Sequence, residues 1–355
     1  MLLKDLCDHN IGTYGIGASA CAYNEEYPVY LRITDISDDG KLLKPFRASI
    51  NPKDYPNWKD YILKMNDLVF ARTGNSTGRN YFHNTNEQLV YAGFLIRFSI
   101  NPSKVLPRYV GYYCQSESYW NQIKTFLEGS TRPTMNAELY KSLDIPIAAR
   151  ELQQHIVDTI GSVDSLIENY EERISCLQKI SSYLYLQLIE HSRKTSHLGN
   201  FIKIETGSMN LDENDPNGRY PFYTRNIGTF YSNKYTNEGK GAVVAGEGNF
   251  TPKFVNGKFG LHQRAYFIQP NTTKLGPEVI YEIILSNKKY LESVAVGSTV
   301  KSLRRFCFEQ MPFFIDTDYF YLNQRLERLF GEIENLKRRE NVLLNQKRIL
   351  LNKYF

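Results

Sequence analysis

Cysteine is scarce in this chain, and no two cysteines lie close together in the sequence. The five cysteines are scattered over 355 residues, at Cys7, Cys21, Cys114, Cys176 and Cys307. A zinc site needs a Cys-x-x-Cys type of spacing, and a disulfide framework needs a denser set of cysteines. We therefore expect free thiols, no metal site and a reducing, cytoplasmic location. His191 and His197 also lack a spacing that suits two metal ligands on one helix or strand.

Long apolar runs are missing as well. The segment MLLKDLCDHN at residues 1–10 has neither a long apolar core nor a small-residue cleavage site. No stretch approaches the roughly 18 apolar residues that a membrane-spanning helix needs. We expect a chain that is neither exported nor inserted, and that has no membrane partner.

Nucleotide-binding and catalytic motifs are absent too. In LVFARTGNSTGRNYF, residues 68–82, Arg79 and Asn80 stand where a Walker loop requires Lys followed by Ser or Thr. The corresponding segment GEGNFTPKF places Glu247 where a phosphate would be repelled. The chain also lacks the glycine-rich loop and the Asn/Asp-Pro-Pro-aromatic segment of a DNA methyltransferase. We expect no catalytic residue and no cofactor, and a nucleotide hydrolase is only a remote alternative.

The composition is that of a folded chain with a mild positive charge. Hydrophobic residues make up 42% of the chain, charged residues 23% and aromatic residues 14%. This balance is typical of globular proteins, and the length suits two or three domains. The net charge of +5 is compatible with a polyanionic partner, but it predicts weak affinity for DNA by the chain alone.

The strongest positive feature is an internal duplication. Three segments of the first half recur, in outline and in the same order, in the second half. The matched pairs are YPVYLRITDI (27–36) with YPFYTRNIGT (220–229), DLVFARTG (67–74) with GAVVAGEG (241–248), and GSTRPTMNAELYKSLDIPI (129–147) with GSTVKSLRRFCFEQMPFFI (297–315). The two halves should therefore contain domains of similar fold.

A long run without proline follows each copy, at 150–190 and at 318–355. In both runs mostly hydrophobic residues recur at alternating intervals of three and four positions, which places them in one line along a helix. We call this line the seam. The seam residues are Ile156, Ile160, Val163, Ile167, Tyr170, Ile174, Leu177, Ser181, Leu184 and Leu188 in the first run, and Leu322, Leu326, Leu329, Ile333, Leu336, Glu340, Leu343, Lys347, Leu350 and Tyr354 in the second. Seams of this length predict that the two helices pack against each other. The alternative is that each helix covers only its own domain.

The remaining parts of both halves are rich in short β-type segments, such as DLVFAR and KGAVVAG, between Gly, Asn and Asp turns. Helices are expected around 108–127 and 277–294. The polar segment HSRKTSHLGN at 191–200 predicts a solvated linker. The fold class that follows is α+β, with two globular domains of similar fold joined by two long helices.

The loop that begins at Arg72 suits contact with a large polyanion better than with a nucleotide. Its Gly, Ser and Thr residues leave little bulk, so a sugar-phosphate backbone or a base edge can approach closely. Arg72 and Arg79 bracket the loop, and arginine is the commonest bidentate partner of guanine. A tight turn with solvated arginines is the alternative for one loop, but the loop occurs at matching points of both halves.

These patterns together resemble the specificity (S) subunit of type I restriction-modification enzymes. The resemblance covers nearly the whole chain and is carried by YLRITDISDDGKL (30–42), LVFARTGNSTG (68–78), GSTRPTMNAELYKSLDIPI with ELQQHIVDTI (129–160), RYPFYTRNIG (219–228), AVVAGEGNF (242–250) and GKFGLHQRAYFI (257–268). It implies two target-recognition domains at 1–150 and 197–317, and two antiparallel coiled-coil spacer helices at 151–196 and 318–355.

The resemblance also implies function and partners. The chain would be a non-catalytic subunit that reads a bipartite, asymmetric target in double-stranded DNA, with its helices docking two methyltransferase subunits and, through them, restriction or translocase subunits. The expected DNA-binding residues are Arg32, Arg72, Thr73, Asn75, Thr77, Arg79, Tyr81, Thr224, Arg225, Asn226, Asn249, Lys253, His262 and Arg264. Two alternatives stay open: His262 as a core histidine, and the whole chain as a coiled-coil protein whose β-rich ends bind proteins or glycans.

Overall fold

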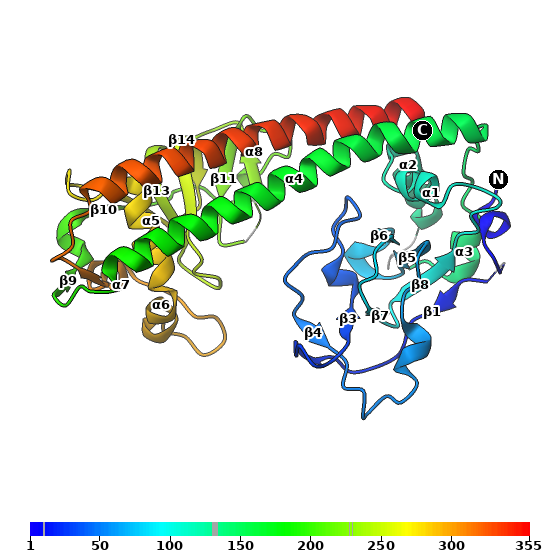
Figure 1. The fold of residues 1–355 in the computed structure, drawn as a ribbon, viewed down its shortest axis with the longest axis horizontal. Helices are drawn as coiled ribbons and strands as arrows, with labels where there is room; N and C mark the ends of the chain where they lie inside the picture. Colours follow the sequence, from blue (N-terminus) through cyan, green and yellow to red (C-terminus); the bar gives the residue numbers. More distant parts are fainter. Residues whose placement is uncertain (10, 130–133, 227, 229) are drawn as a thin grey trace. The chain divides into compact units, whose positions relative to one another are not determined.

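The computed structural model describes residues 1–9, 11–129, 134–226, 228 and 230–355. The chain divides into two compact units. Unit 1 comprises Met1–Glu168 and Asn341–Phe355, and unit 2 comprises Asn169–Glu340. Each unit holds one sheet-rich domain and one part of each of two long helices (Figure 1). The α+β fold class with two sheet-rich domains and long helices is therefore confirmed.

The described residues of the unit 1 domain form two four-stranded sheets and three α-helices. The first sheet has the order β1 (Thr13–Tyr14), β8 (Leu95–Ser99), β5 (Asp67–Ala71) and β6 (Asn80–His83), and the second has the order β2 (Cys21–Ala22), β4 (Ala48–Ser49), β3 (Val29–Leu31) and β7 (Leu89–Tyr91). The helices are α1 (Pro107–Tyr113), α2 (Glu117–Leu127) and α3 (Ala137–Lys141). Their buried aromatic residues pack with Phe70 and Phe98 of the first sheet and with many aliphatic side chains in the main core of the unit.

The unit 2 domain, in its described residues, forms one six-stranded sheet, one two-stranded sheet and three α-helices. The large sheet has the order β10 (Ile202–Thr206), β15 (Ala265–Pro270), β13 (Asn237–Ala245), β14 (Lys253–Leu261), β11 (Tyr220–Tyr223) and β12 (Phe230–Ser232). The small sheet pairs β9 (Thr195–His197) with β16 (Pro312–Phe314). The helices are α5 (Pro277–Ser286), α6 (Lys288–Val294) and α7 (Arg305–Glu309).

The two domains repeat one pattern of strand pairing, which confirms the duplication. β1 pairs antiparallel with β8 as β10 pairs with β15, and β5 lies between β6 and β8 as β13 lies between β14 and β15. β3 pairs parallel with β7, and β11 pairs parallel with β14. In unit 1 the equivalents of β14 are two short strands, β6 and β7. One nine-residue strand therefore joins in unit 2 what are two separate sheets in unit 1.

Backbone hydrogen bonds shift one sequence match by a residue. The Ala92 N–H donates to Leu31 O, and the equivalent His262 N–H donates to Tyr223 O, both at 3.0 Å. Arg32 is therefore equivalent to Thr224, whereas the shared Tyr-Pro of the two segments aligned it with Arg225. The pairing register decides the equivalence, because a slip of one residue turns a side chain to the opposite face of a strand.

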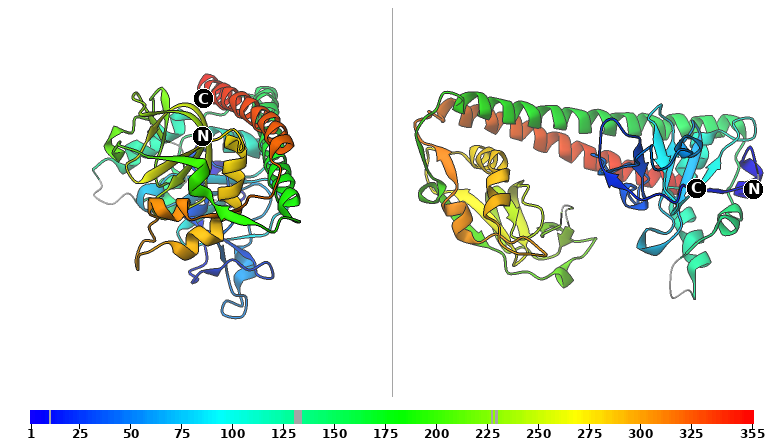
Figure 2. Two further views of the ribbon diagram at one scale, coloured as in Figure 1. Left: turned by 90° about the vertical axis from the view of Figure 1, so that its left-hand side faces the viewer. Right: turned by 90° about the horizontal axis from the view of Figure 1, so that it is seen from below.

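Two long helices, α4 (Arg150–Ile189, 40 residues) and α8 (Phe320–Tyr354, 35 residues), contribute to both units. Within unit 1, Leu351 of α8 packs in the cluster that contains Ile156 and Ile160 of α4. Within unit 2, Ile174 of α4 packs with Ile333 and Leu336 of α8. In each unit the two helices run antiparallel and lie side by side (Figures 1 and 2).

The predicted seam corresponds closely to the buried side of both helices. Its residues are buried or half-buried, except Leu188, which is exposed. The 3-4 spacing missed Tyr185 and Phe330, which are buried against the unit 2 domain rather than between the helices. The buried face of each helix is therefore wider than the predicted seam, because each helix contacts both its partner helix and a domain.

Three local predictions need correction. The expected helix at 108–127 is two helices, because the Ser116 Oγ accepts a hydrogen bond from the Tyr119 N–H at 3.3 Å and starts α2. The expected helix at 277–294 is likewise divided at Asn287, whose side-chain N–H donates to Ile283 O at 2.9 Å. The segment at 191–200 is not a solvated linker, because it contains β9 and the fully buried Leu198.

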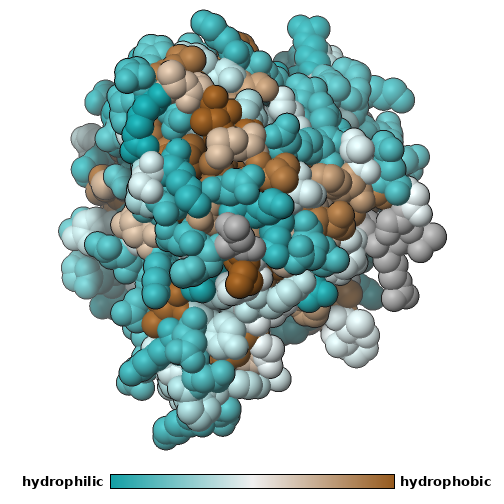
Figure 3. All heavy atoms as spheres, turned by 90° about the vertical axis from the view of Figure 1, so that its right-hand side faces the viewer, coloured by the Kyte–Doolittle hydropathy of each residue, from teal (hydrophilic) through white to brown (hydrophobic). Residues whose placement is uncertain are grey.

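The described residues include no helix long and apolar enough to cross a membrane. They also include no group of three or more His, Cys, Asp or Glu side chains that could hold a metal ion. On the side of the molecule shown in Figure 3, hydrophobic and hydrophilic side chains are interspersed.

Candidate nucleic-acid interface

The matched loops connect equivalent strands of the two domains. The loop between β5 and β6 spans 72–79, and the loop between β13 and β14 spans 246–252. The Arg72 N–H donates to Phe94 O at 3.0 Å, as the Gly246 N–H donates to Arg264 O at 2.8 Å. The ARTG and AGEG sequences are therefore structurally equivalent. Of the GSTRPT motif, residues 130–133 lie outside the described residues.

In unit 1 the end of the loop is fixed by the aromatic core. The Gly78 N–H donates to the Tyr140 hydroxyl at 3.2 Å, and Gly78 O accepts from the Tyr119 hydroxyl at 2.6 Å. Gly78 has φ +93°, and a Cβ there would lie 2.8 Å from the Ile123 side chain. Only glycine fits this backbone and this space. The loop is therefore anchored at one end, and Gly74 and Asn75 at its tip are exposed.

Several predicted residues of unit 1 make contacts inside their own domain. The Arg32 guanidinium pairs with Asp35 at 2.9 Å, and the Arg79 Nε donates to Asp38 Oδ1 at 2.6 Å. The Thr77 Oγ1 donates to Gly74 O at 2.8 Å, within the loop itself.

Tyr81 is only 7% exposed, and burial raises its pKa to about 12. Its hydroxyl lies 3.3 Å from His83 Nδ1. The Tyr81–His83 contact, like the contacts of Arg32, Thr77 and Arg79, holds side chains of the domain around the loop in place.

Arg72 differs from these residues. Its guanidinium lies 5.0 Å from the centre of the Tyr14 ring, a cation–π contact. Its Nε is buried, and within the described part of the chain it has no hydrogen-bond partner. An unpaired buried donor costs roughly 1–3 kcal/mol, so an acceptor supplied by a ligand would be favoured here. Thr73 beside it is half-buried.

In unit 2 two arginines converge on one carboxylate. Arg264 Nη1 lies 2.7 and 2.9 Å from the two Glu247 carboxylate oxygens, and Arg225 Nη1 lies 3.3 Å from Oε2. The hydrogen bond from Arg264 is the main cause that lowers the pKa of Glu247. The carboxylate is thus kept ionised beneath two cations.

The other predicted residues of unit 2 support loops. Thr224 Oγ1 accepts from the Asn226 N–H at 3.1 Å, and Asn249 Oδ1 accepts from the Thr251 N–H at 2.9 Å. Lys253 Nζ donates to the carbonyls of Asn226 and Gly228 at 3.0 and 2.9 Å, and burial lowers its pKa.

His262 is 4% exposed, so the structure favours a core position for it. Its Nδ1 accepts from the Arg264 N–H at 3.1 Å. Burial is the main cause that lowers the pKa of His262, and the charges of Arg225 and Arg264 add to it. The neutral ring positions the backbone of Arg264.

These segments surround a small cavity of about 230 Å³. Val243 and Ala245 contribute apolar groups, and Arg225, Asn249 and Lys253 contribute polar ones. An apolar floor with polar groups at the edge suits a group such as a base edge or a thymine methyl.

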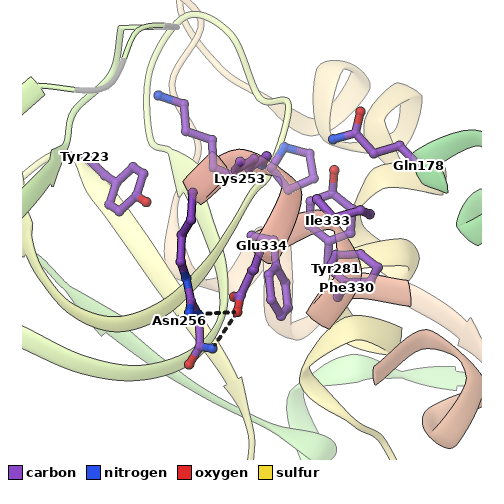
Figure 4. Close-up of a pocket in the computed structure, with 12 residues that line it drawn as sticks. Gln178, Tyr223, Lys253, Asn256, Tyr281, Phe330, Ile333 and Glu334 are labelled. Carbon is purple, nitrogen blue, oxygen red and sulfur yellow. Dashed lines mark hydrogen bonds and ion pairs between the residues drawn. The ribbon is translucent and has the colours of Figure 1, made fainter. Parts of the chain in front are cut away.

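A second cavity of unit 2, about 490 Å³, lies between β14 and the unit 2 parts of α4 and α8 (Figure 4). Tyr281 and Phe330 give it aromatic walls. Glu334 accepts from the Asn256 side chain at 3.0 Å and pairs with Arg338 at 3.9 Å. Because Lys253, Lys337 and Arg338 outnumber the one acid, this cavity favours an anionic group.

The sequence analysis misinterprets one acidic residue here and omits one basic cluster. The sequence predicts that Glu247 repels a phosphate, whereas in the structure Glu247 pairs with two arginines. The Lys-Arg-Arg run at 337–339 is not among the expected site residues, although Lys337 and Arg338 line the second cavity. Three neighbouring positive charges could have indicated the basic cluster at 337–339, whereas no local sequence pattern indicates the role of Glu247.

The comparisons with known proteins agree with this architecture. A family model described as the type I restriction modification DNA specificity domain matches residues 1–179 and 191–315. The specificity subunit of the type I restriction enzyme EcoDI from Escherichia coli is 28% identical over 148 residues, which are 41% of this chain and 33% of that protein. The MjaVIII specificity subunit from Methanocaldococcus jannaschii is 24% identical over 171 residues, 47% of this chain and 39% of that one. These matches thus span well under half of each curated relative.

A solved structure resembles the whole chain. It is the crystal structure of a type I restriction-modification system S subunit from M. genitalium, with a TM-score of 0.54 and 14% identity, and the match covers 100% of this chain and 95% of that chain. At this identity the likeness establishes the fold. The family model covers far more than half of the sequence, and the protein therefore belongs to the family of type I restriction modification DNA specificity domains.

Proposed function

We propose that this chain is the non-catalytic, DNA-recognising subunit of a cytoplasmic type I restriction-modification complex. Each sheet-rich domain, at 1–150 and 197–317, reads one half of a bipartite, asymmetric target, and the helical segments 151–196 and 318–355 separate the halves. The observation that carries the proposal is the membership of this family combined with one fold repeated with different loop residues. Because the two domains share one fold but carry different loop residues, they suit two half-sites of different sequence.

The accessible polar residues of the matched loops are the proposed DNA contacts. They are Arg72, Thr73 and Asn75 in unit 1, and Arg225, Asn226, Asn249 and Arg264 in unit 2. We assign the rest of the expected set to shaping these surfaces, because their side chains are buried, or are half-buried with the charged group bound to Asp35, to Asp38 or to loop carbonyls. This second group is Arg32, Thr77, Arg79, Tyr81, Thr224, Lys253 and His262.

The helices are the proposed docking surface for two methyltransferase subunits and, through them, for restriction or translocase subunits. In unit 2, Tyr183 and Leu186 of α4 and Phe320 and Tyr321 of α8 are exposed large hydrophobic residues. Tyr321 is 72% exposed and borders a groove with Leu184 and Leu188. Exposed apolar side chains of this size are typical of protein-binding surfaces.

The test is to express the chain with the methyltransferase of its own system in a host without DNA methylation, and to map the methylated bases. The expected result is one asymmetric motif made of two short sequences separated by a fixed number of unread base pairs. The same methyltransferase without this chain is the control and should leave no such pattern. A contiguous or palindromic motif, or methylation that does not depend on the chain, would overturn the proposal.

A further inference from the structure

The Arg225–Glu247–Arg264 cluster joins three segments that are far apart in the sequence. Arg225 follows β11, Glu247 lies in the loop between β13 and β14, and Arg264 lies in the turn between β14 and β15. Both guanidiniums are bound through Nη1, at 2.7 to 3.3 Å from the carboxylate. The Nη2 end of each guanidinium therefore lies outside the contact with Glu247.

The backbone beneath the cluster is tied together. The Gly246 N–H donates to Arg264 O at 2.8 Å, the Gly248 N–H donates to Lys301 O at 3.1 Å, and the Arg264 N–H donates to His262 Nδ1. The loop of Glu247 and the turn of Arg264 thus hold each other in place. Side chains fixed before binding lose less conformational freedom on binding, which favours affinity and selectivity.

The position of the Glu247 carboxylate relative to the two arginines favours contact with a base over contact with a phosphate. The side chain of Glu247 is 18% exposed, and those of Arg225 and Arg264 are 45% and 54% exposed, so the cations lie on the solvent side of the carboxylate. One carboxylate cancels one of the two positive charges and would lie close to any bound phosphate. A base edge carries no net charge, and the O6 and N7 atoms of guanine accept two hydrogen bonds from one guanidinium.

We propose that Glu247 holds Arg225 and Arg264 as a fixed reader of guanine, so that the half-site recognised by the unit 2 domain contains at least one G·C pair. The inference rests on the proposed function, since it assumes that this domain reads DNA. Arg225 and Arg264 are the residues that touch the bases, and Glu247 is a positioning residue that acts through them.

Within the described residues, the unit 1 domain has no equivalent of this cluster. The position of Glu247 corresponds to Thr73, that of Arg264 to Phe94, and that of Arg225 to Ile33. These three side chains provide neither a guanidinium nor a carboxylate. The reader is therefore specific to one half-site, and its loss should affect one half of the motif and leave the other half unchanged.

The experiment selects bound sequences from randomised duplex DNA, using the full chain in complex with its methyltransferase. The variants are Arg225→Lys, Arg264→Lys and Glu247→Gln, each compared with the parent chain. Lysine keeps the charge but cannot form the bidentate contact. We expect each Arg→Lys variant to lose about 5- to 150-fold preference for guanine at one position of one half-site. Glu247→Gln should relax the same positions, although it touches no base.

Arg173→Lys is the matched control. Arg173 is also an exposed arginine paired with a glutamate, Glu332 at 3.1 Å, but the pair lies on the helices, away from the reading loops and ten residues along α4 from the proposed docking residue Tyr183. It should leave the selected motif unchanged. The inference is overturned if the parent complex selects a bipartite motif and the variants either keep it or lose affinity equally for all sequences, which indicates phosphate contacts. If the parent complex selects no motif at all, the proposed function itself fails.

Discussion

Buried polar side chains set the form of the reading loops at the scale of single residues. Thr77 and Thr224 close turns with hydrogen bonds to nearby backbone groups, and His262 accepts the N–H of Arg264. These hydrogen bonds fix the loop backbone and thereby the positions of the exposed residues beside it. A change in the charge of a buried group should therefore disturb the fold before it disturbs binding.

Histidine protonation provides a prediction at this scale. Burial lowers the pKa of His262 and of His83 below the unperturbed value of 6.5. Between the folded and unfolded pKa values the unfolded chain binds more protons, so the free energy of unfolding should fall as the pH drops below about 6.5. His262→Gln keeps a hydrogen-bond acceptor for Arg264 and should reduce this pH dependence.

The measurement is urea unfolding of the chain and of the variant at several pH values from 7.5 to about 5. His83 should account for a further part of the pH dependence of the free energy of unfolding, and His83→Gln should remove that part. If His262→Gln kept the whole pH dependence of the parent, folding would have to leave the pKa of His262 unchanged.

At the scale of elements, polar residues within the helix seams attach each helix pair to its own domain. In unit 1, Lys347 Nζ of α8 lies 2.7 Å from Asp164 Oδ1 of α4, and Asp164 Oδ2 accepts from the Tyr112 hydroxyl of α1 at 2.9 Å. In unit 2, Ser181 and Ser182 of α4 donate to Glu282 of α5. The polar seam positions Lys347 and Ser181 thus have partners within the chain, and these contacts select one register.

The Asp164–Lys347 pair supports a prediction about stability. The two side chains are 13% and 11% exposed, so removal of Asp164 takes away the ion-pair partner of a buried ammonium. Removal of Lys347 leaves Asp164 with the longer pair to Arg108 at 3.7 Å. We expect Asp164→Leu alone to lower the free energy of unfolding by about 3–5 kcal/mol, Lys347→Met alone to lower it by less, and the double variant to recover much of the loss of Asp164→Leu. Urea unfolding of the three variants gives the double-mutant cycle.

Glu332→Gln is the control for this prediction. Glu332 pairs with Arg173 on the surface of the helices, where both side chains are about half exposed. Such a pair contributes about 0–1 kcal/mol. Equal losses for Glu332→Gln and Asp164→Leu would show that the unit 1 pair is not a buried contact in solution.

At the scale of the whole molecule, the proposed separation of two half-sites depends on the two long helices. With 40 residues in α4, a straight helix would be roughly 60 Å long, more than the ~34 Å of one DNA turn. The domains attach to both helices within each unit, so the helices can act as a spacer whose length sets the number of unread base pairs.

Lengthening both helices tests the spacer. Seven residues inserted after Glu168 in α4 and after Glu340 in α8 preserve the phase of both seams and add roughly 10 Å at 1.5 Å per residue. At about 3.4 Å per base pair, the unread segment of the methylated motif should grow by about three base pairs, with both half-sites unchanged. An unchanged spacing would exclude the helices as the ruler, and an insertion in α4 alone is the control that breaks the register.

The duplication, the two long helices and the absence of catalytic motifs could be predicted from the sequence alone. Heptad seams and repeated segments are local patterns, and helix pairing depends on side-chain spacing that is visible along the chain. The equivalence of ARTG and AGEG was predictable for the same reason. The match of Arg32 with Arg225 failed because strand register depends on a partner strand far away in the sequence.

The tertiary structure alone decided what each candidate side chain does. Thr224, Lys253 and His262 carry groups suited to DNA, yet the fold directs them to nearby backbone atoms. Glu247 seemed unsuited to a polyanion, yet the fold places it beneath two arginines. A sequence determines which groups are present and how they repeat, whereas burial and pairing arise only when distant strands and turns come together.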